Sequence, residues 1–223
     1  MHEPASHSRK FFWLGWLCAA CLLAVAFACD ASVARWVHDS GLGAWMKDHA
    51  LLRISLRAFG IFWYSFWIGP LLFFLHPQKI RAWALLWTAD AFSAVNCLIK
   101  WLAGRTRPYR LPGDVPQPFY LQPFYGGFRA LLRALLHPTE PSKLAGLDFP
   151  SGDATLAFAT AGALAILLPR WRWYFYLAAS IVAVERVAEN AHYLSDVVAG
   201  AMLGILCALL ARRLLQPRVQ PLL

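Results

Sequence analysis

Charged residues are scarce in this sequence, and their scarcity argues against a soluble domain. They make up 15% of the 223 residues, whereas soluble domains carry about a quarter. Hydrophobic residues make up 59%, and the mean hydropathy is +0.48. The composition therefore indicates an integral membrane protein.

Acidic residues are fewer than basic ones, and cysteines are few. There are 12 Asp and Glu against 21 Lys and Arg, which gives a net charge of +9. A basic collar on one side of a membrane and an anion site on the other explain this charge without nucleic acid. The pair Cys18-x-x-Cys21 has no second pair or nearby His, so a zinc or redox site has little support.

Six apolar runs are candidates for membrane helices. They are 11–29, 54–75, 82–102, 155–168, 173–187 and 197–210. Because a span needs about 20 residues, the fourth and fifth runs must extend into polar flanks. We predict an all-α, polytopic membrane helical bundle of about six transmembrane helices, forming one domain over residues 1–223 with a core at 82–211. The first run is expected to be a retained anchor, because it is too long for a signal peptide.

Basic residues in the short loops predict the orientation of these helices. They are Arg9, Lys10, Lys79, Arg81, Arg170, Arg172, Arg212, Arg213 and Arg218. By the positive-inside rule, these residues and both termini lie in the cytoplasm. The loop 103–150 then faces outward, and within it 128–136 has the pattern of a short amphipathic helix. That helix would flank a lipid entry route or act as a lid.

A cluster of ionisable residues lies between the last two apolar runs. Ionisable groups at such a depth are functional candidates. His192 and Asp196 are four residues apart, so one helix face can hold both, with the Asp orienting the imidazole as a nucleophile or base. Ser195 is a candidate cap for the last helix. An interfacial network without catalysis is the alternative interpretation.

Two further polar segments sit at helix ends. Lys100, Arg105 and Arg107 follow the third run, and this mixture of a point charge and guanidinium forks suits a phosphate. Earlier in that run, a polar stripe at helical spacing consists of Asp90, Ser93, Cys97 and Lys100, with Asn96 beside it. Asp90, Ser93 and Asn96 are expected to make contacts between helices. Pro150-Ser151-Gly152 opens the fourth run and leaves backbone N–H groups free for an anion.

Together, these segments resemble the three-part signature of the type 2 phosphatidic acid phosphatase superfamily, which includes vanadium haloperoxidases. They read Lys100-x6-Arg107-Pro108, Pro150-Ser151-Gly152-Asp153 and Arg186-x5-His192-x3-Asp196. The resemblance implies a lipid phosphatase that needs no metal and no cofactor. It also implies a bacterial inner membrane location, with the site facing the periplasm.

The resemblance implies a role for each matching residue. His192 would be the nucleophile that forms a phosphohistidine, and Asp196 its orienting partner. The remaining positions would bind the phosphate: Lys100, Arg107, Ser151, Gly152 and Arg186. The expected partner is a lipid phosphate or diphosphate, such as phosphatidate, phosphatidylglycerol phosphate, a polyprenyl (undecaprenyl) diphosphate or lipid A. Transfer of the phosphate to a second lipid would use the same residues.

Three positions depart from the family pattern. Asp153 replaces the usual His that protonates the leaving alkoxide, Glu185 replaces a Ser, and Leu194 stands where Pro is frequent. Asp153 could be a protonated acid, or the leaving group could be a phosphate that needs no acid. Alternatively, the protein binds lipid phosphates with impaired catalysis. The acid is preferred, because a bound phosphate dianion favours a protonated neighbour.

Overall fold

The computed structural model describes residues 5–60, 67, 68, 70, 74, 79–105, 107, 108 and 148–215. The helix predicted at 128–136 and half of the span predicted at 54–75 lie outside these residues. Within them the chain is helical and contains no strand, as the sequence predicts. The elements are α1 (Ala5–Asp39), α2 (Leu42–Asp48), α3 (Ala50–Arg57), η1 (Ala58–Gly60), α5 (Lys79–Ser93), α6 (Val95–Ala103), α8 (Gly152–Leu167), η4 (Pro169–Trp171), α9 (Arg172–Ala188) and α10 (Leu194–Leu215).

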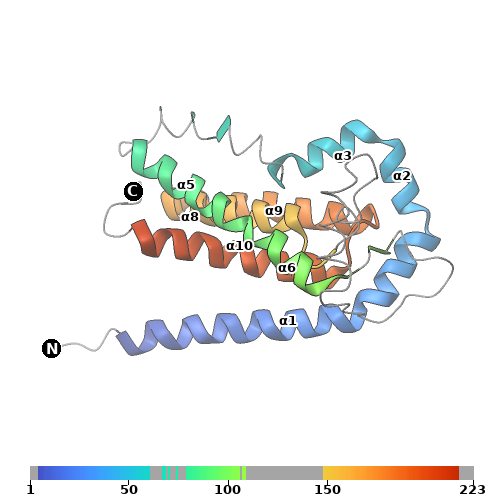
Figure 1. The fold of residues 1–223 in the computed structure, drawn as a ribbon, viewed down its shortest axis with the longest axis horizontal. Coiled ribbons are helices and arrows are strands. Elements are labelled where there is room, and N and C mark those ends of the chain that lie inside the picture. The colour runs from blue at the N-terminus through green and yellow to red at the C-terminus, as the bar shows by residue number, and fades with distance from the viewer. Residues whose placement is uncertain are drawn as a thin grey trace, which may run out of the picture.

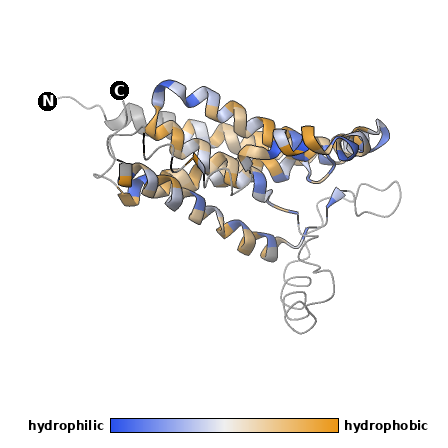
Figure 2. Ribbon diagram, turned by 90° about the horizontal axis from the view of Figure 1, so that it is seen from above, coloured by the Kyte–Doolittle hydropathy of each residue, from blue (hydrophilic) through white to orange (hydrophobic). Residues whose placement is uncertain are grey.

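Helix α8 is the centre of the bundle. It packs against α9, α10 and α5, while α1 runs along the outer side of α10 (Figure 1). The short helices α2 and α3 lie at one end of the bundle, and hydrophobic residues run along the long helices (Figure 2). The N-terminal end of α1 and the C-terminal end of α10 lie together at the opposite end (Figure 1).

Small side chains allow the central helices to approach closely. The buried core between α5, α8 and α10 is rich in alanine, including Ala89, Ala159, Ala163 and Ala208. At Gly200 on α10, an added Cβ would lie 2.7 Å from the carbonyl oxygen of Ser151. Such contacts between small residues are the usual way in which membrane helices pack tightly. They hold the N-terminal ends of α8 and α10 side by side.

Three stretches are long and apolar enough to cross a membrane: Trp13–Asp39, Ile80–Lys100 and Leu194–Leu215. Helix α8 is apolar but shorter, so a total of six spans stays a prediction. Two helix boundaries differ from the predicted spans. Helix α1 continues to Asp39, beyond the span end predicted near Cys29, because the chain has no Gly or Pro between Gly15 and Gly41 and polar residues alone do not stop a helix. The third span is interrupted at Ala94, between α5 and α6.

The polar stripe on α5 and α6 joins these helices to α8. Thr160 donates a hydrogen bond to Asp90 over 2.9 Å, and the Asn96 amide donates to Thr155 Oγ1, also over 2.9 Å. The contacts between helices that the sequence predicts at Asp90 and Asn96 are therefore confirmed. Cys97 is exposed instead, because the interruption at Ala94 turns it away from that face.

Candidate active site

The three motifs meet at the end of the bundle opposite the termini. The first follows α6, which ends at Gly104 with a left-handed φ of 64°. The second is the N-terminus of α8, capped by Ser151, and the third is the turn between α9 and α10 (Figure 1). Because α8 and α10 pack closely, the Ser151 N–H reaches the Asp196 carbonyl oxygen over 2.9 Å. Residues from distant parts of the sequence thus share one small volume.

His192 lies between two buried carboxylates. Its Nδ1 is in close contact with Asp148 Oδ1 and lies 3.7 Å from Asp196 Oδ2. The side chain of Asp196 also accepts a hydrogen bond from the Tyr193 N–H over 2.7 Å. With Nδ1 facing carboxylates, Nε2 is the nitrogen left for nucleophilic attack.

Asp148 is a site residue that sequence reasoning missed. It comes three residues before Ser151, at the end of a long loop, and belongs to none of the three motifs. Its side chain is buried and adjacent to His192, so its position allows it to orient the imidazole, as the sequence expects of Asp196. The only available signal was an acidic residue next to the Pro-Ser-Gly segment.

Burial and charge shift the pKa values of Asp148 and His192 in opposite directions. Burial raises the pKa of Asp148 to about 7, although the neighbouring His192 opposes this shift. Burial alone would lower the pKa of His192, but the Asp148 and Asp196 carboxylates outweigh it and raise that pKa above its ordinary value. The carboxylates thus favour a proton on Nδ1, which leaves Nε2 as the unprotonated nitrogen of the neutral imidazole.

The predicted phosphate-binding residues surround the same end of α8. An added Cβ at Gly152 would lie 3.7 Å from Lys100 Nζ, which places the ammonium group at the start of this helix. Arg107 and Arg186 line a cavity of about 300 Å³, together with Lys47 and Arg57. The buried Nε of Arg107 has no hydrogen-bond partner among the described residues. The cavity thus presents four cationic side chains and one carboxylate, that of Glu189.

Lys47 and Arg57 were not predicted as site residues. They belong to the short helices α2 and α3, and Arg57 falls within a run that the sequence assigns to a membrane span. A basic residue at the edge of an apolar run was the only signal. Arg53, one turn earlier on α3, pairs with Glu189 over 2.7 Å. Arg53 therefore joins α3 to the C-terminal end of α9.

Asp153 forms ion pairs with two of these arginines. Its Oδ2 lies 2.8 Å from Arg57 Nη2 and 3.1 Å from Arg186 Nη1. Burial alone would raise the pKa of Asp153, but the two guanidinium groups outweigh it and hold the pKa below its ordinary value. The carboxylate form is therefore favoured, opposite to the protonated acid preferred on sequence grounds.

Arg186 is held by three carboxylates. Its Nε donates to Glu185 Oε2 over 2.7 Å, its Nη1 faces Asp153, and its Nη2 contacts Glu189. Glu185, which replaces the usual Ser, is buried and so has a structural explanation as the partner of Arg186. An anion entering the cavity would compete with these carboxylates for the guanidinium group.

Three sequence-based assignments differ from the structure. Arg105, expected beside the phosphate, is buried and pairs with Asp30 and Asp196. Ser195 does not cap α10, because its hydroxyl donates to Asp30 over 2.5 Å. His192 lies in the turn before α10, so its closest carboxylate comes from Asp148 and not from the helix face shared with Asp196.

The cluster of His192, Asp148 and Asp196 has the donor atoms of a metal site. One atom from each lies within 4.8 Å of the others. However, the Arg105 guanidinium lies 2.5 Å from Asp196 Oδ1, and its positive charge opposes a cation at this position. The arrangement suits a protonated imidazole nitrogen better than a metal ion.

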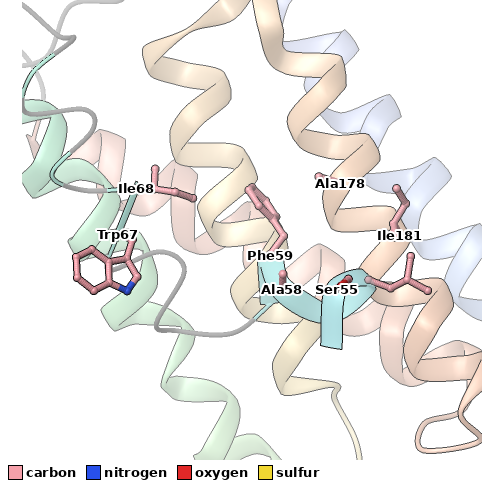
Figure 3. A pocket seen from close by; sticks show the side chains of 8 residues that line it. Ser55, Ala58, Phe59, Trp67, Ile68, Ala178 and Ile181 are labelled. Carbon is pink, nitrogen blue, oxygen red and sulfur yellow. The ribbon is translucent and has the colours of Figure 1, made fainter. Parts of the chain in front are cut away.

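An apolar pocket of about 500 Å³ lies elsewhere, between η1, the segment at Trp67 and Ile68, and α9 (Figure 3). Phe59 extends toward its centre, and Ala178 and Ile181 of α9 form one wall (Figure 3). Among the residues that the structure describes, no ionisable side chain lines it. These lining residues offer no groups for phosphate chemistry, in contrast to the cavity at Arg107.

Comparisons with known proteins identify the family of this chain. The PAP2 superfamily model matches residues 81–220, so the chain belongs to the PAP2 superfamily. A lipid A 1-phosphatase of Rhizobium etli is 31% identical over 204 residues, covering 83% of this chain and 79% of that protein. A lipid A 1-phosphatase of Rhizobium johnstonii is 44% identical over 63 residues, which is 28% of this chain and 26% of that protein.

A solved structure shows the same fold. The crystal structure of Aquifex aeolicus LpxE matches with a TM-score of 0.50 and 22% identity, covering 72% of this chain and 85% of that one. The family assignment made from the three motifs and the all-helical membrane fold are both confirmed.

Proposed function

We propose that the protein is a membrane lipid phosphatase that removes phosphate from a lipid of the lipid A type through a phosphohistidine at His192. Membership in the PAP2 superfamily and the two lipid A 1-phosphatase relatives support a lipid phosphatase. The observation that carries the mechanism is His192, with Nδ1 held by carboxylates at the end of the bundle where four cations line a cavity.

The reaction has two steps. Nε2 of His192 attacks phosphorus, a P–N bond forms, and the bond from phosphorus to the lipid oxygen breaks, leaving the electron pair on that oxygen. Water then attacks phosphorus, the P–N bond breaks with its electron pair returning to Nε2, and inorganic phosphate leaves. Bulk water takes up the proton that the attacking water loses and supplies the proton that the lipid oxygen gains. Lys100, Arg107 and Arg186 hold the phosphate oxygens, since phosphoryl transfer depends mainly on positioning and charge neutralisation.

Asp153 is proposed to act as a carboxylate that aligns Arg57 and Arg186, and not as a proton donor. Its two ion pairs favour the ionised form. Without an acid, the best substrates are those whose leaving group needs little help. A sugar 1-phosphate leaves through its anomeric oxygen, which is a weaker base than an ordinary alkoxide, and a lipid diphosphate leaves as a phosphate.

The proposed setting is a bacterial inner membrane with the site on the periplasmic side. The apolar helices and the lipid A 1-phosphatase relatives support a bacterial membrane protein. The basic residues of the short loops support this orientation, because they are expected on the cytoplasmic side.

The test is phosphate release by purified protein in detergent from a panel of lipids. The panel contains lipid A 1-phosphate, phosphatidate, phosphatidylglycerol phosphate and a polyprenyl diphosphate, with EDTA present throughout. We expect turnover of lipid A 1-phosphate and the diphosphate, loss of turnover in His192→Ala, and no loss in His38→Ala, a histidine exposed on α1. Binding of these lipids without any turnover would instead identify a lipid-phosphate-binding protein.

A further inference from the structure

A buried polar cluster connects α1 to the start of α10, directly after the turn that carries His192. It consists of Asp30 on α1, Arg105 after α6, and Ser195 and Asp196 on α10. All four side chains are buried, with exposed fractions of 6%, 3%, 0% and 0% in that order. None of them lines the cavity at Arg107. Three separate segments of the chain thus place charged groups together away from the phosphate-binding residues.

Asp30 uses both of its carboxylate oxygens in this cluster. Oδ1 accepts from the Ser195 N–H over 2.8 Å, and Oδ2 accepts from the Ser195 hydroxyl over 2.5 Å. Oδ2 also accepts from Arg105 Nη2 over 2.7 Å. The carboxylate therefore fixes the first turn of α10 and the guanidinium group at the same time.

Arg105 passes this constraint on to Asp196. Its Nη1 donates to Asp196 Oδ1 over 2.5 Å and to the Ser195 hydroxyl over 2.7 Å. The guanidinium also stacks on the Tyr193 ring, 3.9 Å from its centroid. The other oxygen of Asp196 lies 3.7 Å from His192 Nδ1. A continuous chain of contacts thus runs from Asp30 through Arg105 and Asp196 to His192.

Packing alone does not account for Asp30. Only 11% of an 18-residue apolar stretch of α1 is buried inside the protein. The Asp30 carboxylate is nevertheless buried and points at the first turn of α10. A buried charge is retained only when it is paired, and an Ala or Ser here would join α1 to the bundle more simply. We propose that Asp30 is a positioning residue for catalysis, which holds Arg105 and Asp196 so that His192 keeps its attacking geometry. This inference rests on the proposed function of His192.

The test is a double-mutant cycle on purified protein with lipid A 1-phosphate. Asp30→Asn keeps the shape of the side chain and should lower kcat by about 10²-fold with little change in KM, because a small displacement of a reacting group has this effect. Asp39→Asn makes the same charge change at an exposed position of the same helix and should leave kcat unchanged. In an Asp196→Asn background, Asp30→Asn should add little, because coupled residues are not additive.

Two results would overturn the inference: full kcat in Asp30→Asn, or losses from Asp30→Asn and Asp196→Asn that simply multiply. If Asp30→Asn does not fold, Ser195→Ala removes only the hydroxyl that Asp30 and Arg105 share. It should lower kcat several-fold at constant KM, and an unchanged kcat would equally overturn the inference.

The two failures are distinguishable. If the proposed function is wrong, the wild type itself shows no turnover of lipid A 1-phosphate. The rate at which diethyl pyrocarbonate modifies His192, followed by mass spectrometry, then tests the positioning role directly. Asp30→Asn should raise this rate several-fold relative to Asp39→Asn. Equal rates in the two variants would contradict the inference.

Discussion

The imidazole of His192 faces two carboxylates in different electrostatic settings. Asp196 is neutralised by Arg105, 2.5 Å away, and is further held by the Tyr193 N–H. Asp148 forms no ion pair with a Lys or Arg within the described part of the chain, so its charge acts on His192 with less compensation. Asp148 is therefore expected to be the stronger influence on the protonation of His192.

This difference predicts a shift in the pH profile of Asp148→Asn. A nucleophilic histidine must be neutral, so activity falls as pH drops through its pKa. The carboxylates raise the pKa of His192, and removing one of them lowers it again. The acidic limb of kcat/KM against pH should therefore move to lower pH in Asp148→Asn. A limb that stays in place would show that Asp148 does not control the charge of His192.

The ion pairs of Asp153 lead to a second prediction at this scale. If the carboxylate only aligns Arg57 and Arg186, Asp153→Asn should bind phosphate at least as tightly as the wild type. It should also keep its activity on substrates with good and with poor leaving groups alike. Asp153→His should raise kcat for poor alkoxide leaving groups by as much as about 10²-fold, because it restores an acid. A leaving-group series on the wild type and both variants measures this. A loss in Asp153→Asn confined to poor leaving groups would identify Asp153 as the acid after all.

At the scale of elements, the contact between α8 and α10 determines where the motifs meet. Gly200 lets the backbone of α10 approach Ser151, whose N–H then bonds to Asp196. The helix that begins after Ser151 and the helix that follows His192 are thereby fixed to each other. A side chain at this contact would separate the second motif from the third.

Gly200→Ala tests this dependence. Its Cβ would lie 2.7 Å from the Ser151 oxygen and 3.1 Å from the Ala154 Cβ, so we expect overpacking that lowers stability by about 1–3 kcal/mol. The melting temperature in detergent and kcat should both fall. Gly15→Ala on α1 is the matched control, because nothing lies within 4 Å of its added Cβ. Equal melting temperatures for the two variants would mean that the close approach is not required.

Helices α2 and α3 show what local sequence patterns cannot predict. Residues 54–75 are apolar enough to predict a span, yet Ile54–Arg57 belong to a short helix that brings Arg57 to Asp153. Arg53 and Arg57 lie one turn apart, so they share a helix face. Their partners, Glu189 and Asp153, are separated from them by 136 and 96 residues. Contacts over such separations depend on the tertiary arrangement and leave no local signal.

At the scale of the whole molecule, both ends of the described chain lie at one end of the bundle and the motifs at the other (Figure 1). The sequence predicts this arrangement well, because apolar periodicity and the positions of the motifs are local features. Through the spacing of a single motif it singles out His192, Asp196 and Arg186, which the structure brings to the same end of the bundle. It misses Asp148 and Asp30, and misplaces Arg105, because their roles depend on helices that meet only in the folded protein.

The arrangement predicts the topology in the membrane. A single cysteine at position 120, in a variant without the five native cysteines, should react with a membrane-impermeant maleimide added from the periplasmic side. A tag after residue 223 should be accessible only from the cytoplasm. Labelling at position 120 from the cytoplasmic side alone would reverse the proposed orientation.

The central claim is that His192 carries the phosphoryl group, and trapping that intermediate tests it most directly. Wild-type protein mixed with lipid A carrying a ³²P-labelled 1-phosphate and quenched in alkali should contain label that is stable to base and labile to acid, as expected for phosphohistidine. Peptide mass spectrometry should place it on His192, and His192→Ala should contain none. Label on another residue, or labelling that persists in His192→Ala, would contradict the account.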